Sequence, residues 1–138
     1  MAYWLLKTEP ETYSFADLEH EGTTRWEGVS NNLALKHLRS IKKNDCAFIY
    51  HTGKEKAVVG IAEVVKAAYP DPSGNNPKQV VVDIKVKQRL QRAVTLAELK
   101  GDRTFASFEL VRMPRLSVMP VTGAHWNAIV KKSSLKPG

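Results

Sequence analysis

Two long β-type segments on either side of a loop constrain the fold of this chain most strongly. Residues 58–67 are apolar and rich in β-branched side chains around Gly60, which predicts a buried strand with the glycine at a bulge or bend. From Val82 to Leu90, apolar side chains alternate with charged, mainly basic ones, the period-two pattern of a strand with one wet face. Between them, residues 69–77 contain three prolines, one glycine and two asparagines, and predict a loop long enough to frame a site.

The other predicted elements are short. We expect strands over 2–7 and 46–51, and helices that begin after Ser14, near Asn31, at Thr95 and near Thr122. Ser14 and Thr95 are suited to capping helix N-termini, and Gly101 to ending the third helix. Because strands and helices do not alternate regularly, the pattern favours an α+β fold over a doubly wound sheet. We expect a small mixed, mostly antiparallel β-barrel decorated with short helices.

Composition fits one compact domain over residues 1–138, with 43% hydrophobic content. No run approaches the roughly 18 apolar residues that cross a membrane, and the N-terminus lacks the pattern of a signal peptide. We therefore expect a cytoplasmic, monomeric protein. Cys46, the single cysteine, lies in a predicted strand and is expected to be a small buried hydrophobe. The four histidines lack metal-ligand spacing, so neither a metal nor a cofactor is expected.

The chain is strongly basic, with a formal net charge of +7. Such a charge is the electrostatic footprint of a protein that binds polyanions, although it is equally compatible with simple solubility. Any single basic residue is more often a solvated surface charge than a ligand contact. The candidates for contacts to a nucleic-acid backbone are Lys7, Lys54, Lys85, Lys87, Arg89 and Arg115.

The segment from Trp26 to Asn32 combines a large flat ring, a glycine and two amides on a predicted loop. An extruded base needs an aromatic face, worth roughly 1 to 3 kcal/mol per base, and polar groups for its edge. Trp26 suits the first role, and Gly28 would let a backbone approach closely. Thr8 and Ser117 suit the second role, together with the amides. The alternative is that Trp26 belongs to the core, as most tryptophans do.

Short motifs follow one another in a fixed order along almost the whole chain. They are Tyr3-Trp4-Leu5, Thr8-Glu9-Pro10, Tyr13-Ser14, Trp26-Glu27-Gly28-Val29, Tyr50-His51, Val59-Gly60-Ile61, Tyr69-Pro70-Asp71, Arg115-Leu116-Ser117-Val118 and Trp126. In this order they resemble the EVE domain, the family of thymocyte nuclear protein and its bacterial relatives. The resemblance implies a stand-alone PUA-like domain with a pocket for one modified nucleobase, such as methylated cytosine or adenine, in DNA or RNA.

The resemblance and the residue chemistry together give a set of candidate nucleobase-binding residues. They are Thr8, Glu9, Pro10, Trp26, Gly28, Val29, Ser30, Asn31, Asn32, Tyr50, His51 and Ser117. The chain departs from the family pattern at three positions. Ser30 and Leu35 stand where arginines are usual, and Met119 stands where many members have a glutamine. These departures bear on the affinity and preference of the pocket.

Two other classes of function remain as alternatives to a non-catalytic binder. The related ASCH domains include a small amidohydrolase that acts on a modified nucleoside through lysine, threonine and glutamate, and this chain has Lys7, Thr8 and Glu9 together. Neighbours in a strand point to opposite faces, however, so Lys7 would not readily activate the Thr8 hydroxyl. We therefore expect no catalysis. A plain protein-interaction module would leave the basic strand and the Trp26 segment unexplained.

Overall fold

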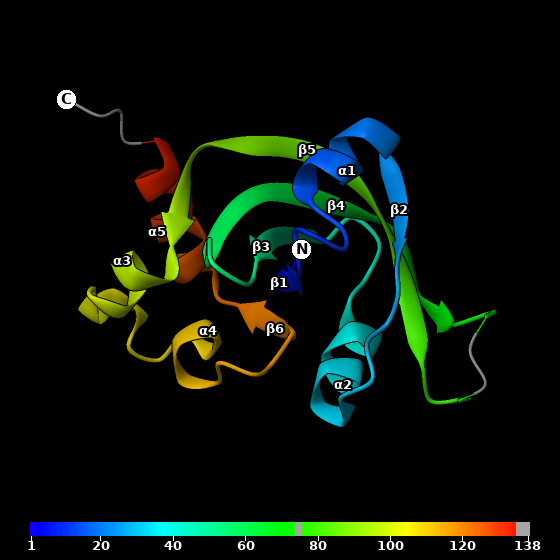
Figure 1. Ribbon diagram of the computed structural model, residues 1–138. Coiled ribbons are helices and arrows are strands. Elements are labelled where there is room, and N and C mark those ends of the chain that lie inside the picture. The colour runs from blue at the N-terminus through cyan, green and yellow to red at the C-terminus, as the bar shows by residue number, and fades with distance from the viewer. Residues whose placement is uncertain (74–75, 135–138) are drawn as a thin grey trace.

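A computed structural model describes residues 1–73 and 76–134. Its strands are β1 (Tyr3–Thr8), β2 (Thr23–Trp26), β3 (Cys46–His51), β4 (Ala57–Pro70), β5 (Val80–Thr95) and β6 (Val118–Val121). Its helices are α1 (Phe15–Glu21), α2 (Asn32–Ser40), α3 (Leu96–Lys100), the 3-10 helix η1 (Arg103–Phe105), α4 (Glu109–Arg112) and α5 (Gly123–Ser134). One six-stranded sheet has the order β2-β5-β4-β3-β1-β6 (Figure 1). β1 and β3 run parallel and the other neighbours antiparallel, which confirms the expected α+β class.

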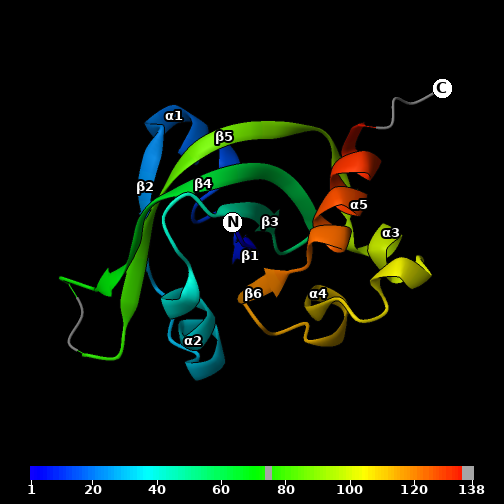
Figure 2. The ribbon, with the colours of Figure 1, turned by 180° about the vertical axis from the view of Figure 1, so that it is seen from behind.

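The two long strands β4 and β5 arch over the rest of the sheet (Figures 1 and 2). Their pairing shifts register between Val58 and Gly60, which confirms the predicted irregularity. A Cβ atom at Gly60 would lie 2.3 Å from the Phe15 ring, so only glycine lets α1 pack this closely on the sheet. Both strands are longer than predicted. The expectation of a loop from residue 69 is wrong at its start, because Tyr69 and Pro70 pair in the sheet; residues 74–75 of that loop lie outside the described ranges.

β6 was not predicted as a strand, yet it forms one edge of the sheet. It pairs antiparallel with β1, with Leu6 opposite Val118 and Trp4 opposite Pro120. The proline obscured the strand pattern, but an edge strand tolerates a residue that donates no hydrogen bond. This pairing joins strands from the beginning and the last quarter of the chain and places Ser117 beside β1, where its carbonyl accepts a hydrogen bond from the Lys7 backbone at 3.0 Å.

Helix α2 lies between the edge strand β6 and the two long strands β4 and β5. It packs against β6 on one side and against β4 and β5 on the other, as Figure 1 shows. Ala34, Leu35 and Leu38 form its buried face, with the spacing of one side of a helix. Asn31 caps the helix by accepting a hydrogen bond from the Ala34 N–H at 3.0 Å. The cap fixes the direction in which the chain leaves β2.

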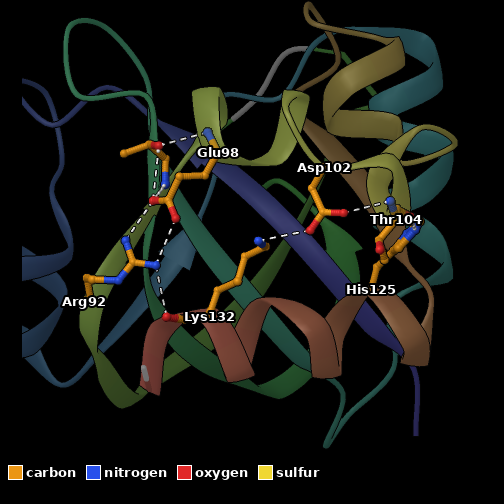
Figure 3. A network of polar contacts seen from close by, with 7 residues as sticks. Arg92, Glu98, Asp102, Thr104, His125 and Lys132 are labelled. Carbon is orange, nitrogen blue, oxygen red and sulfur yellow. Dashed lines mark hydrogen bonds and ion pairs between the residues drawn. The ribbon is translucent and has the colours of Figure 1, made fainter. Parts of the chain in front are cut away.

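Helix α5 is tied to β5 and α3 by a network of charged groups (Figure 3). Arg92 makes two hydrogen bonds to the Glu98 carboxylate, at 2.8 and 2.9 Å, and a third to the Lys132 carbonyl at 3.1 Å. The Lys132 ammonium in turn lies 3.0 Å from Asp102. Glu98 also completes the predicted capping box with Thr95. The hydrogen bonds from Arg92 are the main reason why the pKa of Glu98 is lowered to about 2.

The core contains two of the three tryptophans as ordinary packing residues. The Trp4 indole N–H donates to Asp45 at 2.9 Å, and Trp126 stacks on Phe48 with ring centroids 3.8 Å apart. Cys46 is a free, buried thiol, as expected. Within residues 1–73 and 76–134, no helix has both the length and the apolar character that a membrane crossing requires.

Candidate functional site

A pocket of about 600 Å³ opens between the end of β1, the end of α1 and the segment that joins β2 to α2. The loop between β1 and α1 also contributes to its walls through Thr12 and Tyr13, and the β1–β6 pairing brings in Ser117. The lining residues are Lys7, Thr8, Thr12, Tyr13, Glu21, Thr24, Arg25, Trp26, Glu27, Gly28, Val29, Ser30, Asn31 and Ser117.

Trp26 lines this pocket although its side chain is only 7% exposed. The prediction that it stands on a loop is wrong, because Trp26 is the last residue of β2 and pairs with Val82 of β5. Its indole N–H meets no acceptor within residues 1–73 and 76–134, and in those ranges no buried polar side-chain atom is left without a partner. The N–H must therefore be accessible to solvent, and Trp26 is one of the residues that line the pocket. Trp26 is a core residue with one edge in the site.

Tyr13 supplies a second aromatic wall that the sequence analysis did not assign to the site. Its ring meets Trp26 edge-on, with centroids 6.2 Å apart and planes at 84°. Its hydroxyl donates a hydrogen bond to Glu21, and the Thr8 hydroxyl donates to its backbone carbonyl at 2.7 Å. Burial, with the hydrogen bond to Glu21, raises the pKa of Tyr13 to about 12. The Tyr13-Ser14 motif of the family pattern was the available signal for this wall.

The segment after β2 forms the opposite rim. Gly28 has a φ of +83°, a conformation that favours glycine. Within residues 1–73 and 76–134 no atom lies within 4 Å of a Cβ built there, so the positive φ is the reason within the fold for a glycine, and the space beside Gly28 is open. Asn31 uses its side-chain oxygen for the α2 cap, which leaves its amide N–H groups available to the pocket. Val29 is buried beneath this rim.

The pocket carries charges of both signs. Glu21 and Glu27 face it together with Lys7 and Arg25, and the carboxylate of Glu27 lies 3.9 Å from the Arg25 guanidinium. Such a site is close to neutral and offers hydrogen-bond acceptors as well as donors. Apart from Lys7, the sequence analysis did not select these charged residues. For Arg25 and Glu27 the signal was adjacency to Trp26, whereas Glu21 reaches the site only through the packing of α1.

Five of the predicted base-binding residues do not line this pocket: Glu9, Pro10, Asn32, Tyr50 and His51. His51 is buried and has a structural role. Its Nε2 accepts a hydrogen bond from the backbone N–H of Phe15 at 3.0 Å, and its Nδ1 lies 2.7 Å from Glu55. The ring thereby ties α1 to the end of β3. Tyr50 is also buried and faces a different cavity.

Most of the predicted backbone contacts lie outside the pocket. Only Lys7 lines it. Lys85 and Lys87 lie 3.9 and 4.0 Å from the two carboxylate oxygens of Glu63, and Arg89 is bonded to Glu19. Part of the basic face of β5 is therefore neutralised within the protein. Lys54 and Arg115 are exposed.

The residues of the hydrolase alternative are bonded to separate partners. The Lys7 ammonium donates to the Pro114 carbonyl at 2.8 Å, whereas the Thr8 hydroxyl donates to Tyr13. Burial lowers the pKa of Lys7 from its ordinary value. Two of the positions that depart from the family pattern, Leu35 and Met119, are buried in the core, whereas Ser30 is on the pocket rim.

Comparisons with known proteins bear on this site. The model of the EVE domain family matches residues 2–132. Thymocyte nuclear protein 1 of Rattus norvegicus is 33% identical over 98% of this chain and 75% of its own length. The NMR structure of Rpa0253 from Rhodopseudomonas palustris has a TM-score of 0.92 and 39% identity, and the match covers 100% of this chain and 97% of that one.

The human THYN1 protein, solved in complex with DNA that contains 5-methylcytosine, has a TM-score of 0.92 and 30% identity over 99% of this chain and 100% of that one. An ASCH protein from Zymomonas mobilis shares the fold alone, with a TM-score of 0.60 and 14% identity over 94% of both chains. The PUA-like fold implied by the sequence motifs is thereby confirmed. With a family model that matches nearly its whole length, this chain belongs to the EVE domain family.

Proposed function

We propose that this protein binds a single modified nucleobase, such as methylated cytosine or adenine, extruded from single-stranded or locally opened DNA or RNA, and that it catalyses no reaction. The observation that carries the proposal is the pocket in which the edge of Trp26, the Tyr13 ring and the Asn31 amide meet. The complex of human THYN1 with 5-methylcytosine DNA supports it from outside this chain.

The dimensions and chemistry of the pocket suit a nucleobase. Its volume of about 600 Å³ lies within the range of small-ligand sites. An extruded base is normally held by aromatic or apolar contacts and by hydrogen bonds to its edge. Cytosine and adenine both present an exocyclic amino group, for which the carboxylate of Glu27 is a suitable acceptor. The Asn31 amide and the Trp26 indole N–H are donors for the acceptor atoms of the ring.

Binding without catalysis is favoured by the hydrogen bonds at the end of β1. A lysine that activated the Thr8 hydroxyl would have to lie within hydrogen-bonding reach of it. Instead Lys7 donates to Pro114 and Thr8 donates to Tyr13. The hydroxyl that the hydrolase alternative needs as its nucleophile is thus engaged with the backbone.

Fluorescence polarisation with short labelled strands tests the proposal. Strands that carry 5-methylcytosine, N6-methyladenine or no modification, each as DNA and RNA, are titrated at one stated salt concentration. We expect one modified strand to bind more tightly than its unmodified counterpart. Equal affinities throughout would contradict a modified-base pocket. Chromatography of modified nucleosides after incubation with the protein tests the absence of catalysis, which product formation would overturn.

Trp26→Phe is the informative variant of the tryptophan. Trp26→Ala would remove a buried ring and destabilise the protein by about 3 to 5 kcal/mol, so a loss of binding there would say little about the pocket. Phenylalanine keeps an aromatic ring in the core and removes the indole N–H. We expect several-fold weaker binding of the preferred strand, with Trp126→Phe as the control because Trp126 lies outside the pocket. Unchanged affinity for Trp26→Phe would exclude the indole N–H from recognition.

A further inference from the structure

A second, smaller cavity lies next to the pocket and is lined by lysines. It has a volume of about 260 Å³ and shares Lys7 with the larger pocket. Its other lining residues are Tyr50, Thr52, Gly53, Lys56, Leu96, Lys100, Leu110 and Pro114. Within residues 1–73 and 76–134, three lysines and a threonine thus line it, and no acidic residue does. We refer to this cavity as the lysine cavity.

The three ammonium groups come from separate parts of the fold. Lys7 is near the end of β1, Lys56 lies in the turn between β3 and β4, and Lys100 ends α3. The elements are fixed to one another, since Thr52 donates its backbone N–H to Thr8 at 2.9 Å and Leu96 donates to the Lys56 carbonyl at 2.8 Å. Three cations are therefore gathered around one hollow by the tertiary structure.

None of these lysines is neutralised by a neighbouring acid. Within residues 1–73 and 76–134, neither Lys56 nor Lys100 forms an ion pair, in contrast to Lys85 and Lys87 beside Glu63. Lys7 is partly buried, and burial lowers its pKa. An anion placed here would relieve that cost of burial. Lys56 and Lys100 are exposed, so solvent screens their charges, but like charges around one cavity still repel one another, and a ligand that carries negative charge would offset this repulsion.

The backbone of Lys56 is a further sign of a specialised site. Its φ is +46°, in the left-handed region where glycine is favoured. A lysine in this conformation carries a free-energy cost relative to the right-handed one. Glycine would remove that cost, yet the chain has a lysine whose side chain lines the cavity.

We propose that the lysine cavity binds a phosphate group of the nucleic-acid backbone, adjacent to the nucleotide whose base enters the larger pocket. The inference rests on the proposed function for the identity of its ligand, because it takes the phosphate from the same strand. Lys7 links the two sites because it lines both of them. Its neighbour Thr8 lines the larger pocket, which we call the base pocket. The base pocket supplies recognition of the modification, and the lysine cavity holds the strand in register irrespective of sequence.

The double variant Lys56→Gln with Lys100→Gln tests this inference, and Lys42→Gln with Lys43→Gln is its charge-matched control. Lys42 and Lys43 are exposed and line neither cavity. Polarisation with a modified single strand is repeated over a series of salt concentrations. We expect the double variant to bind all strands more weakly, with the slope of log K against log salt flattened by roughly 0.7 for one lost phosphate contact and with unchanged preference for the modification. The slope of the control variant should be closer to the wild-type slope than the slope of the double variant is.

Neutral methylphosphonate linkages placed singly on either side of the modified base identify the phosphate. A methylphosphonate at one position should weaken binding by the wild-type protein and leave binding by the double variant unaffected. If affinity instead depends only on a terminal 5′-phosphate, the cavity binds a phosphate monoester and the backbone assignment is overturned. Equal slopes in the double variant and its control, with no methylphosphonate effect, would overturn the lysine cavity as a phosphate site.

Titration with inorganic phosphate, followed by NMR of the Thr52 and Gly53 amides, separates this inference from the proposed function. Saturable shifts that are lost in the double variant, in a protein that shows no preference for any modified strand, would retain the anion site and contradict the base reader. A clear preference for one modified strand, without such shifts and without a slope change, would retain the reader and reject the phosphate site.

Discussion

Individual residues in this protein serve the core and the site together. Trp26 is buried, yet it also lines the pocket. Asn31 caps α2 with its oxygen and presents its N–H groups to the same space. Because each side chain contributes to the fold and to the pocket, truncating it changes both stability and affinity. A substitution that keeps the atom needed for the fold and changes the atom that faces the ligand tests the two contributions separately.

Asn31→Asp makes this separation for the α2 cap. An aspartate keeps the oxygen that accepts from the Ala34 N–H and suits the helix N-terminus, so stability should be unchanged or slightly higher. The amide donor, however, is replaced by a charged acceptor. We expect roughly five-fold or greater loss of affinity for the preferred strand, since one hydrogen bond contributes about 1 kcal/mol. Polarisation measures the affinity and thermal unfolding the stability.

Asn32→Asp is the matched control, because Asn32 is the next residue, undergoes the same charge change and does not line the pocket. Equal losses in the two variants would mean that the added negative charge, rather than the lost amide, weakens binding. The Asn31 amide would then have no part in recognition.

At the scale of elements, two contacts determine where the helices lie on the sheet. Phe15 of α1 packs directly over Gly60 of β4, and the Arg92–Glu98 pair joins β5, α3 and α5 (Figure 3). The first contact sets the position of α1, whose last residue Glu21 reaches the base pocket. The second secures the end of β5 from which α3 carries Lys100 to the lysine cavity.

Gly60→Ala should destabilise the protein by at least about 1 to 3 kcal/mol, the usual cost of overpacking a core. The new methyl group would lie 2.3 Å from the Phe15 ring, so α1 has to move. Denaturant unfolding measures the loss. Gly101→Ala is the control, because its methyl group would come no closer than 3.5 Å to another atom. Similar stabilities for the two variants would show that α1 adjusts without cost.

Glu98 should make stability depend on pH in the acid range. Its pKa falls from an ordinary 4.5 to about 2 in the folded protein, chiefly through the hydrogen bonds from Arg92. A carboxyl group whose folded pKa is depressed contributes stability that is fully present above 4.5 and is lost as the pH falls towards 2. In Glu98→Gln the free energy of unfolding should therefore be lower at neutral pH and should fall less steeply over that window.

Urea unfolding at a series of pH values provides the comparison for Glu98→Gln. Glu11→Gln removes an equal charge from an exposed residue that makes no side-chain hydrogen bond within residues 1–73 and 76–134, and it should keep the wild-type pH dependence. An unchanged acid slope in Glu98→Gln would show that the Arg92 pair, which is partly exposed, is screened by solvent.

At the scale of the whole molecule, the net charge of +7 matters less than its distribution. The basic face of β5 is the most visible cationic pattern in the sequence, but Glu63 and Glu19 from neighbouring elements lie against it. In the part of the chain that the structure describes, Lys7, Lys56 and Lys100 of the lysine cavity form no ion pair, and they are distant from one another in sequence. Long-range attraction of a nucleic acid depends on all of the charges of the protein, whereas specific phosphate contacts depend on which basic side chains the fold places close together.

Lys85→Gln with Lys87→Gln should therefore have a modest effect on binding. We expect affinity for modified and unmodified strands to fall alike, by roughly two-fold or less at physiological salt, because only screened long-range attraction is removed. Salt-dependent polarisation provides the measurement. Loss of discrimination between modified and unmodified strands would show instead that this face of β5 contacts bases.

Local patterns determined most of the elements and part of the site. Apolar periodicity located β4, β5 and α2, and capping residues marked the starts of α1 and α3, because these signals act over a few residues. The family motifs and the residue chemistry together pointed to a set of residues that line one pocket: Thr8, Trp26, Gly28, Val29, Ser30, Asn31 and Ser117. Edge strands β2 and β6 were missed, since four residues with polar or proline positions carry little periodicity.

The tertiary structure alone decided which of these residues share a space. The family resemblance and the residue chemistry suggested that Tyr50 and His51 join the base pocket. In the fold, β3 pairs parallel with β1, Tyr50 lines the lysine cavity, and His51 bonds the start of α1. The sequence patterns also did not predict that Glu21 lines the pocket, or that Lys56 and Lys100 line one cavity with Lys7. Contacts between distant segments depend on strand order and helix packing, and short-range patterns do not encode these.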